Sequence, residues 1–492
     1  MARRIAVYSL VAAVLLLAGA EAQPANDTPQ CEYAVTVLDS KAHAADVTVT
    51  CHQSIKGFRF TDDFPTNWVS AFTDANGVAL RRKGSEWRSD AAAITGARYH
   101  LDLDGMTRSE DDYDSAKRSG NSVLVDLSGV IAIPIADAEA KGSDELSIRF
   151  AAPNGGAIAT SLPLVGNAYR VRADEIDFAS ALILGTFQRR TLRVPLPLSL
   201  VAGAQASEAR DPAGEIELVV MDGAFKATTD EIADWVRATA LANADLWHGF
   251  PVARSTVVIL PVPGEVHVPT GHVIATGGIM VFVQVGAEIA PRALYDEWVL
   301  VHEFIHLGTP YIRDTGAWFN EGLATYLEPI IRYRAGWRSA ESVWEEWTGW
   351  MGRGLEPMTT GLENGNPYWG GALFALTADI QLRRLTGGRL GLEDCVRLIL
   401  AKEGDVSVTA KTMGTLAIGD SNSPEPVLTR LAAAHLPGAP MDLDALFASL
   451  GVHKSADGKI EFDDSAPLAD VRHWILEGGP GSRTNPIPIP VN

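Results

Sequence analysis

Positive charge is in short supply in this chain. It has 41 lysines and arginines against 61 aspartates and glutamates, which gives a formal net charge of −20 at pH 7. Proteins that bind nucleic acid or anionic membranes gather lysine and arginine on one surface. We therefore expect no nucleic-acid partner and no electrostatic attachment to a membrane.

Three other features are rare or missing. The chain has 3 cysteines, and their separations do not fit a zinc site built from thiolates. The G-x-S-x-G pattern of a nucleophilic serine does not occur, which argues against a Ser-His-Asp hydrolase. After the first residues, no apolar run is long enough to cross a bilayer, and no internal repeat is present.

The first residues have the pattern of an export signal. A basic start is followed by an apolar run over 5–18 and then by Ala20-Glu21-Ala22, which has the A-x-A form of a cleavage site. The alternative is an uncleaved anchor, but the run is short for a span of about 20 apolar residues. We predict that Met1–Ala22 is a cleaved signal peptide. The mature protein would then be periplasmic or extracellular and free of the membrane.

The two early cysteines predict a disulfide. Cys31 and Cys51 bracket two alternating runs separated by a polar turn, the pattern of a strand hairpin. Because exported proteins can form disulfides, this pair would clamp the hairpin. Cys395 lies in an apolar helical pattern and is predicted to be a buried free thiol.

Periodicity along the chain predicts an α+β protein. Short runs that alternate apolar and polar residues fill most of 23–214, which predicts an antiparallel β domain of the sandwich type. Small and polar residues at 206–215 mark its end. Helical periodicity dominates after Pro291. The predicted domains that follow are a mixed domain at 215–355, a helical domain at 356–476 and a flexible Gly/Pro-rich tail at 477–492.

A possible metal site stands in the stretch "VHEFIHLGTPYIRDTGAWFNEGLATYLEP". A helix is predicted over 291–307, where His302 and His306 lie one turn apart on the same face and can reach one metal ion. Glu303 can lie beside that metal without binding it. The helix is apolar almost all round, so both histidines are expected to be buried and to need partners.

A catalytic zinc needs a third protein ligand, and Glu321 is the leading candidate. A short connection returns a second helix antiparallel to the first, which brings Glu321 near its start back toward the histidines. Thr325 and Glu328 share the face of Glu321. Either is a candidate to hydrogen-bond a bound imidazole, and the alternative for Glu328 is a solvated helix charge.

Two segments resemble a known family. "HEFIH" followed by "WFNEGLATYLEP" resembles the gluzincin metallopeptidases, in particular their aminopeptidase-N-like and glycyl-aminopeptidase-like branches. The resemblance implies a thermolysin-like catalytic domain after the β domain, Zn²⁺ bound by His302, His306 and Glu321, and Glu303 as the catalytic carboxylate. "NPYWGGALFALTADIQLRRLTGG" resembles the Tyr-x-x-Gly helix start of that family, which implies Tyr368 as the donor that stabilises the oxyanion.

The chain also departs from this family. The gap between His306 and Glu321 is shorter than in aminopeptidase-N relatives by about one helical turn, and no PDZ-like loop follows the helices. In those relatives a strand reading G-x-M-E-N binds the substrate's free α-ammonium group through its glutamate. The comparable "GGIMVFVQV" has Val281 and Phe282 instead, so its edge could pair with a peptide but would not anchor an ammonium group. This predicts cleavage inside peptides, or a preference for apolar segments, over strict one-residue trimming, unless Glu288 supplies the missing carboxylate.

The sequence therefore predicts an exported zinc peptidase that acts on peptides or proteins. A water activated by zinc and deprotonated by Glu303 would attack the peptide carbonyl. The alternative is an exported binding or scaffold protein with a structural or fossil zinc site. The intact Glu303 favours the peptidase, because a structural site needs ligands but no base.

Overall fold

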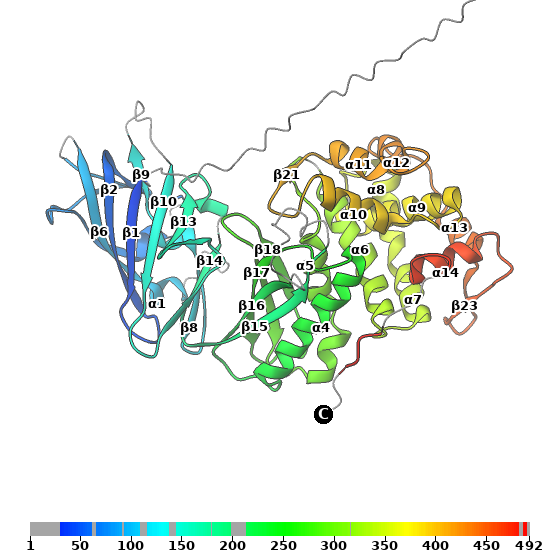
Figure 1. Cartoon of the computed structure of the whole chain (residues 1–492), viewed down its shortest axis with the longest axis horizontal. Coiled ribbons are helices and arrows are strands. Elements are labelled where there is room, and N and C mark those ends of the chain that lie inside the picture. Colours follow the sequence, from blue (N-terminus) through cyan, green and yellow to red (C-terminus); the bar gives the residue numbers. More distant parts are fainter. Residues whose placement is uncertain are drawn as a thin grey trace, which may run out of the picture.

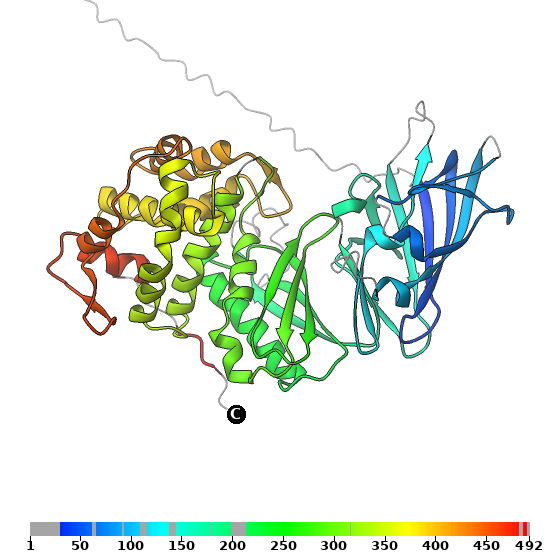
Figure 2. The same cartoon turned by 180° about the vertical axis from the view of Figure 1, so that it is seen from behind.

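The structure of the protein is a computed structural model. The molecule has three regions along its length (Figures 1 and 2). The β-rich N-terminal region forms one end, a sheet flanked by helices forms the middle, and a group of helices forms the other end. The predicted signal peptide lies outside the described residues. Those are 30–61, 65–90, 93–108, 116–136, 144–178, 180–197, 213–314, 316–481 and 486–489.

The N-terminal region is a sandwich of two sheets, as its alternating pattern predicts. Buried residues of both sheets, such as Val47 and Leu182, meet in one apolar core. The pairing is antiparallel except between β1 and β10, which are parallel. The larger sheet contains β1 (Cys31–Val37), β2 (Ala44–Arg59), β3 (Val69–Asp74), β4 (Arg81–Lys83), β5 (Glu86–Arg88), β6 (Ile94–Asp102), β9 (Ile133–Ala136), β10 (Glu145–Ala151), β12 (Leu164–Val165) and β13 (Ala168–Arg172). The smaller contains β7 (Ala116–Ser119), β8 (Ser122–Asp126), β11 (Ala157–Ala159) and β14 (Ala181–Gly185), and the short helices α1 (Leu103–Met106) and α2 (Leu127–Val130) connect strands.

The predicted disulfide is confirmed. Cys31 and Cys51 lie directly opposite each other on the antiparallel strands β1 and β2 and are bonded. Both are buried in the core of the sandwich. Cys395 is a buried free thiol, also as predicted.

A second sheet forms the middle of the molecule. Its strand order is β15 (Phe187–Pro195), β16 (Ala213–Met221), β17 (Arg254–Val262), β19 (Met280–Gly286) and β18 (Thr270–Ile274). The three inner strands are parallel, and the two edge strands are antiparallel to their neighbours. Helix α4 (Thr229–Trp247) covers this sheet and begins with a capping box, in which Thr228 and Glu231 bond each other's backbone N–H.

Two predictions about this sheet are wrong. The predicted boundary at 214 is too late, because β15 pairs with β16 along its whole length and so belongs to the second sheet. The strand "GGIMVFVQV" does not offer an edge to a peptide, because β19 is paired on both sides. The free edge belongs to β18, the strand that precedes it in the chain.

The remaining elements are mainly helices that share one apolar core with the second sheet. The helix predicted over 291–307 is interrupted. A 3₁₀ turn, Pro291–Asp296, ends at Glu297. The extended backbone of Glu297 separates this turn from the α-helix that begins at Val299. The helices are α5 (Val299–His306), α6 (Ala317–Arg334), α7 (Ala340–Trp350), α8 (Leu355–Thr360), α9 (Pro367–Thr386), α10 (Leu392–Lys402), α11 (Thr412–Asp420), α12 (Val427–His435), α13 (Leu443–Ser449) and α14 (Ala469–Glu477). Short strand pairs join β20 (Tyr311–Ile312) to β21 (Thr409–Ala410) and β22 (Val452–Lys454) to β23 (Ile460–Phe462).

Part of the predicted flexible tail is packed against the second core. The backbone N–H of Ile487 donates to the carbonyl of Ala335 at 3.0 Å. The indole N–H of Trp337 donates to the carbonyl of Ile487 at 3.2 Å. Ile489 also contacts the second core.

Within the described ranges, each helix is too short or too polar to span a bilayer.

Candidate metal centre and active site

Helix α5 carries the two histidines of the motif into the interior. Its residues Val299–Ile305 are all buried, so packing rather than capping determines where this short helix lies. The chain leaves the helix at Gly308, where a Cβ atom would lie 2.4 Å from the indole of Trp247. Only glycine fits this close approach, which directs the chain away from α4 and toward the second helix.

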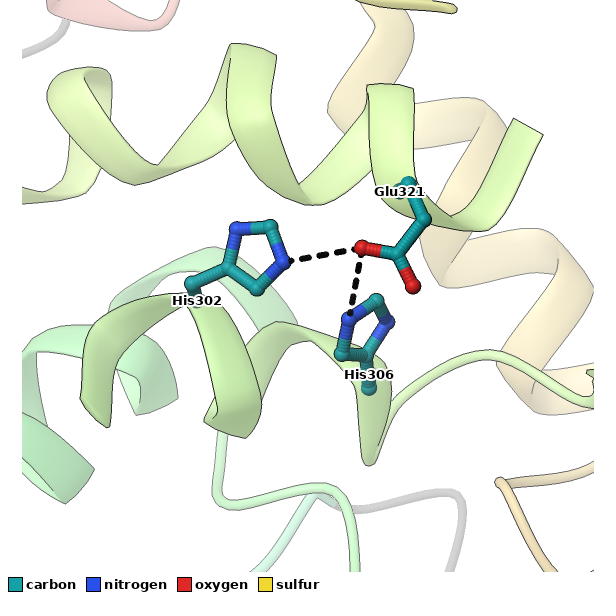
Figure 3. Close-up of side chains that lie close together, drawn as sticks. All are labelled: His302, His306 and Glu321. Carbon is teal, nitrogen blue, oxygen red and sulfur yellow. Dashed lines mark hydrogen bonds and ion pairs between the residues drawn. The ribbon is translucent and has the colours of Figure 1, made fainter. Parts of the chain in front are cut away.

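The connection to α6 is held by hydrogen bonds. The Asp314 carboxylate accepts from the hydroxyl of Thr412 at 2.5 Å and from its backbone N–H at 3.1 Å. Strand β20 pairs with β21 in the same region. Helix α6 then begins at Ala317 and places Glu321 in its second turn, facing α5 (Figure 3).

The structure brings His302, His306 and Glu321 together (Figure 3). The Nε2 atom of His302 lies 3.2 Å from Oε2 of Glu321, and that of His306 lies 3.7 Å from the same oxygen. One ligand atom from each of the three residues lies within 4.8 Å of the other two. No other group of this kind occurs among the residues that the structure describes.

These residues fit a zinc ion. Tetrahedral zinc with bonds of about 2.0–2.1 Å places neighbouring ligand atoms about 3.3–3.4 Å apart. The two measured separations from Glu321 bracket that value. Two imidazole nitrogens and one carboxylate oxygen are also the donor set of a catalytic zinc site that keeps a position open.

At His302 and Glu321 the electrostatics favour the protonation states that bind metal. At His306 burial lowers the pKa of the imidazole, but the hydrogen bond to Glu321 and the nearby carboxylate of Glu303 outweigh burial and raise that pKa. Burial lowers the pKa of His302 to about 4, so its imidazole is neutral at pH 7. Burial opposes ionisation of Glu321, but the hydrogen bonds from His302 and His306 outweigh it and hold the pKa of this carboxyl well below its usual range. A neutral imidazole and an ionised carboxylate are the forms that donate electron pairs to a cation.

Glu303 is buried beside the three residues without joining them. Burial raises its pKa to about 7, an effect that nearby His306 partly opposes. Its side chain meets strand β18 at Gly271, where a Cβ atom would lie 2.8 Å from Cγ of Glu303 and 2.9 Å from Val299. Sequence reasoning missed Gly271, and no local pattern marks it, because the contact joins segments that are not adjacent in the chain.

Aromatic side chains surround His302. Tyr368 lies near the start of α9, with its ring centroid 6.1 Å from that of His302. Burial raises the pKa of Tyr368, and the nearby carboxylates of Glu321 and Glu303 raise it further, so the hydroxyl keeps its proton at pH 7. Trp298 contacts the same imidazole edge-on at 5.3 Å. Tyr368 and Trp298 are both substantially exposed to solvent.

The helices that carry Glu321 and Tyr368 touch through glycines. A Cβ atom on Gly322 would lie 2.1 Å from Cα of Gly371, and one on Gly371 would lie 1.7 Å from the carbonyl oxygen of Trp318. The backbones of α6 and α9 are therefore in direct contact one residue after Glu321 and three residues after Tyr368. This contact sets the distance between the two functional residues.

The predictions for Thr325 and Glu328 need correction. The Thr325 hydroxyl donates to the backbone carbonyl of Glu321 at 2.7 Å, within its own helix. Glu328 is neither a partner of an imidazole nor a solvated charge, because it is buried and pairs with Arg332 at 2.5 Å. Nδ1 of His302 is buried and has no hydrogen-bond partner among the described residues.

In fold, the chain is similar to a solved structure of an aminopeptidase N family protein. That protein is from Idiomarina loihiensis, and the match has a TM-score of 0.63 and 14% identity over 86% of this chain and 78% of that one. Another match is a mutant M1 zinc metallopeptidase from Deinococcus radiodurans bound to a Tyr-Ser-Ala substrate, with a TM-score of 0.47 and 14% identity over 85% and 95% of the two chains. No family model and no curated protein matches the sequence.

The first of these similarities shows the fold of the chain. It is a mixed α+β architecture of the kind found in the aminopeptidase N family protein, and this confirms the predicted fold class. At 14% identity the likeness establishes no activity. The chemistry has to be argued from the residues of the site.

Proposed function

We propose that this protein is an exported, zinc-dependent peptidase. The observation that carries the proposal is the convergence of His302, His306 and Glu321 beside a buried carboxylate that is not one of them, Glu303. Three ligands alone would suit a structural metal. A second carboxyl group, buried next to them and free to exchange a proton, suits hydrolysis.

Each residue has a role in this proposal. A zinc ion held by His302, His306 and Glu321 would supply a Lewis acid that polarises the substrate carbonyl and makes water more acidic. Glu303 takes the proton of the attacking water and later gives it to the leaving amine. The protonated hydroxyl of Tyr368 donates a hydrogen bond to the carbonyl oxygen as negative charge develops there.

Replacing Glu303 tests this function. Glu303→Gln keeps the size of the side chain and removes the proton acceptor, so turnover of a peptide should fall by at least about 10²-fold. Zinc content, measured by elemental analysis, should stay the same. An unchanged rate would exclude Glu303 as the base, and loss of zinc would make it a ligand.

We also propose export and cleavage inside peptides. Export is supported by the disulfide between Cys31 and Cys51, since such bonds persist in oxidising compartments. Internal cleavage is supported by the free edge of β18, which can pair with an extended peptide beside Glu303. An N-acetylated peptide should be cut about as fast as the free one. If acetylation abolishes cleavage, the enzyme trims N-termini.

A further inference from the structure

The connection between α5 and α6 determines where Glu321 lies relative to the two histidines. His302 and His306 belong to α5 and Glu321 belongs to α6, so the described residues between the helices, 307–314 and 316, set the distance between the two parts of the metal centre. Distances from a metal ion to its ligands vary by only about 0.2 Å. A small change in the path of this connection would therefore change how well the three residues hold a metal.

The path of the connection follows a segment from much later in the chain. Residues 406–412, which we call the bracing segment, contain β21 and run parallel to β20 of the connection. The backbone N–H of Tyr311 donates to the carbonyl of Val408 at 2.7 Å, and that of Arg313 donates to the carbonyl of Ala410 at 3.3 Å. Backbone groups of the connection thus find their partners outside the two helices that it joins.

The bracing segment reaches both ends of the connection. The backbone N–H of Val406 donates to the carbonyl of Leu307, the last residue of the α5 turn, at 3.3 Å. At the other end, a Cβ atom on Gly316, which precedes the first residue of α6, would lie 2.2 Å from the hydroxyl oxygen of Thr412. One segment therefore contacts the end of the histidine helix and the start of the glutamate helix.

Apolar burial fixes the bracing segment, and one polar contact connects it to the start of α6. Val406 and Ala410 are buried in the second core, together with Ile312 of the connection. Thr412 is also buried, and both its hydroxyl and its backbone N–H donate to the exposed Asp314 carboxylate. Hydrogen bonds to an ionised carboxylate are about twice as strong as those between neutral groups. Loss of the Thr412 hydroxyl should therefore loosen the connection close to α6.

We propose that Asp314 and Thr412 are positioning residues of the metal centre. Their contact holds the connection in the form that places Glu321 against the two histidines, although the two residues are 98 positions apart in the chain. The inference rests on the proposed function for the identity of the metal, Zn²⁺. It adds that the start of α11 sets the affinity of the site. Because linkage is reciprocal, zinc binding should in turn stabilise the pairing of the bracing segment with the connection.

The first test measures the Kd for zinc of the metal-free, full-length protein by competition with a chromophoric chelator. Thr412→Val keeps the shape of the side chain and removes its hydroxyl, so the Kd should rise about tenfold, as expected for the loss of a hydrogen bond to a charged group. Thr412→Ser keeps the hydroxyl and should keep the wild-type Kd. Asp314→Ala removes the acceptor from an exposed position and repeats the test in case Thr412→Val does not fold.

Thr429→Val is the matched control. The Asp420 carboxylate accepts from the hydroxyl of Thr429 at 2.8 Å and from its backbone N–H at 2.9 Å, the same arrangement at the start of α12. This variant loses the same kind of hydrogen bond away from the connection, so it should leave the Kd for zinc unchanged. The comparison separates positioning of the metal ligands from a general loss of stability.

Hydrogen exchange provides a second readout that does not depend on turnover. Zinc added to the metal-free wild-type protein should slow exchange at the amides of Tyr311 and Arg313, and this slowing should be weaker in Thr412→Val but not in Thr429→Val. A higher Kd in Thr412→Val, in a protein that cleaves no peptide, would support this inference and contradict the peptidase proposal. Cleavage with a Kd that Thr412→Val and Asp314→Ala leave unchanged, or exchange that zinc does not slow, would overturn the inference.

Discussion

At the residue scale, the behaviour of His302 comes from its surroundings. A histidine in water has a pKa near 6.5 and would be partly charged in mildly acidic solution. Burial in the protein interior lowers that pKa to about 4, which keeps the imidazole neutral. Its Nδ1 atom has no partner among the described residues, while Nε2 points at Glu321. The Nε2 atom is therefore the ring nitrogen that is placed to donate its electron pair to a metal ion.

Removing either His306 or Glu321 should release the metal. Wild-type protein should hold about one zinc per chain, because these residues supply two of its three ligands. His306→Ala and Glu321→Ala should each fall well below that ratio after dialysis, as measured by elemental analysis. Glu341→Ala, which changes an exposed glutamate of α7, is the matched control and should keep the zinc. One zinc that survives both substitutions would show that the ligands are elsewhere.

At the element scale, the crossing of α6 and α9 organises the site. Two helices normally lie 8–10 Å apart, and small residues are needed for a closer approach. Gly322 and Gly371 allow the backbones to touch, which brings the helix of Glu321 and the helix of Tyr368 together. Nearby, the Tyr326 hydroxyl donates to the buried Asp379 carboxylate at 2.7 Å and fixes the same two helices along their length.

A methyl group at this crossing should be harmful. Gly371→Ala places a Cβ atom against the carbonyl oxygen of Trp318, which is backbone and cannot rotate away. The free energy of unfolding in urea should fall by about 1–3 kcal/mol, as for other overpacked sites. Turnover should fall as Tyr368 moves away from Glu321, with KM changing less than kcat. The control is Gly349→Ala in α7, where a Cβ atom meets nothing within 4 Å. Equal stability of the two variants would show that the contact is not tight.

At the scale of the whole molecule, two large cores are joined by a small one. One core fills the N-terminal sandwich, and the other runs from the second sheet to α14. A small core, in which Leu124 and Ala181 of the sandwich pack with Met280 and Phe282 of the second sheet, connects the two. Because the disulfide lies wholly within the sandwich, its effect on stability should be confined to that region.

Reduction of the disulfide should therefore destabilise the sandwich selectively. Opening a loop with a sequence separation of 20 should cost about 3 kcal/mol in the chain-entropy model. Calorimetry should show one transition moving to lower temperature and the transition of the second core staying in place. The double variant Cys31→Ser/Cys51→Ser should be insensitive to reductant. Thiol counting on denatured, unreduced protein should find one reactive cysteine, and three would contradict the pairing.

Much of the site followed from local pattern alone. The spacing of His302 and His306 requires a helix to bring both to one metal, and the short connection requires an antiparallel return for Glu321. The hairpin pattern around Cys31 and Cys51 likewise predicted their pairing. The grouping of the three residues and the disulfide are confirmed, because each depends on residues close together in the chain, where helix and strand geometry fixes what can meet.

Other features were decided only by contacts between distant segments. A two-residue period marks β18 and β19 as strands, but it cannot show which of them lies at the edge, and the prediction chose the wrong one. The same period could not assign β15 to the second sheet, because pairing depends on the partner strand. Glu328 seemed either a solvated charge or a partner of an imidazole, and its pairing with Arg332 became clear only from the packing around α6.

The sequence by itself determined which residues come together: the three candidate metal ligands, the neighbouring Glu303 and the disulfide lie in short segments whose own geometry brings them together. The tertiary structure decided which strands pair and which strand edge is left free. These depend on how the sandwich, the second sheet and the helices pack, and the free energy of that packing comes from many weak contacts between residues far apart in the chain. No single segment contains that information.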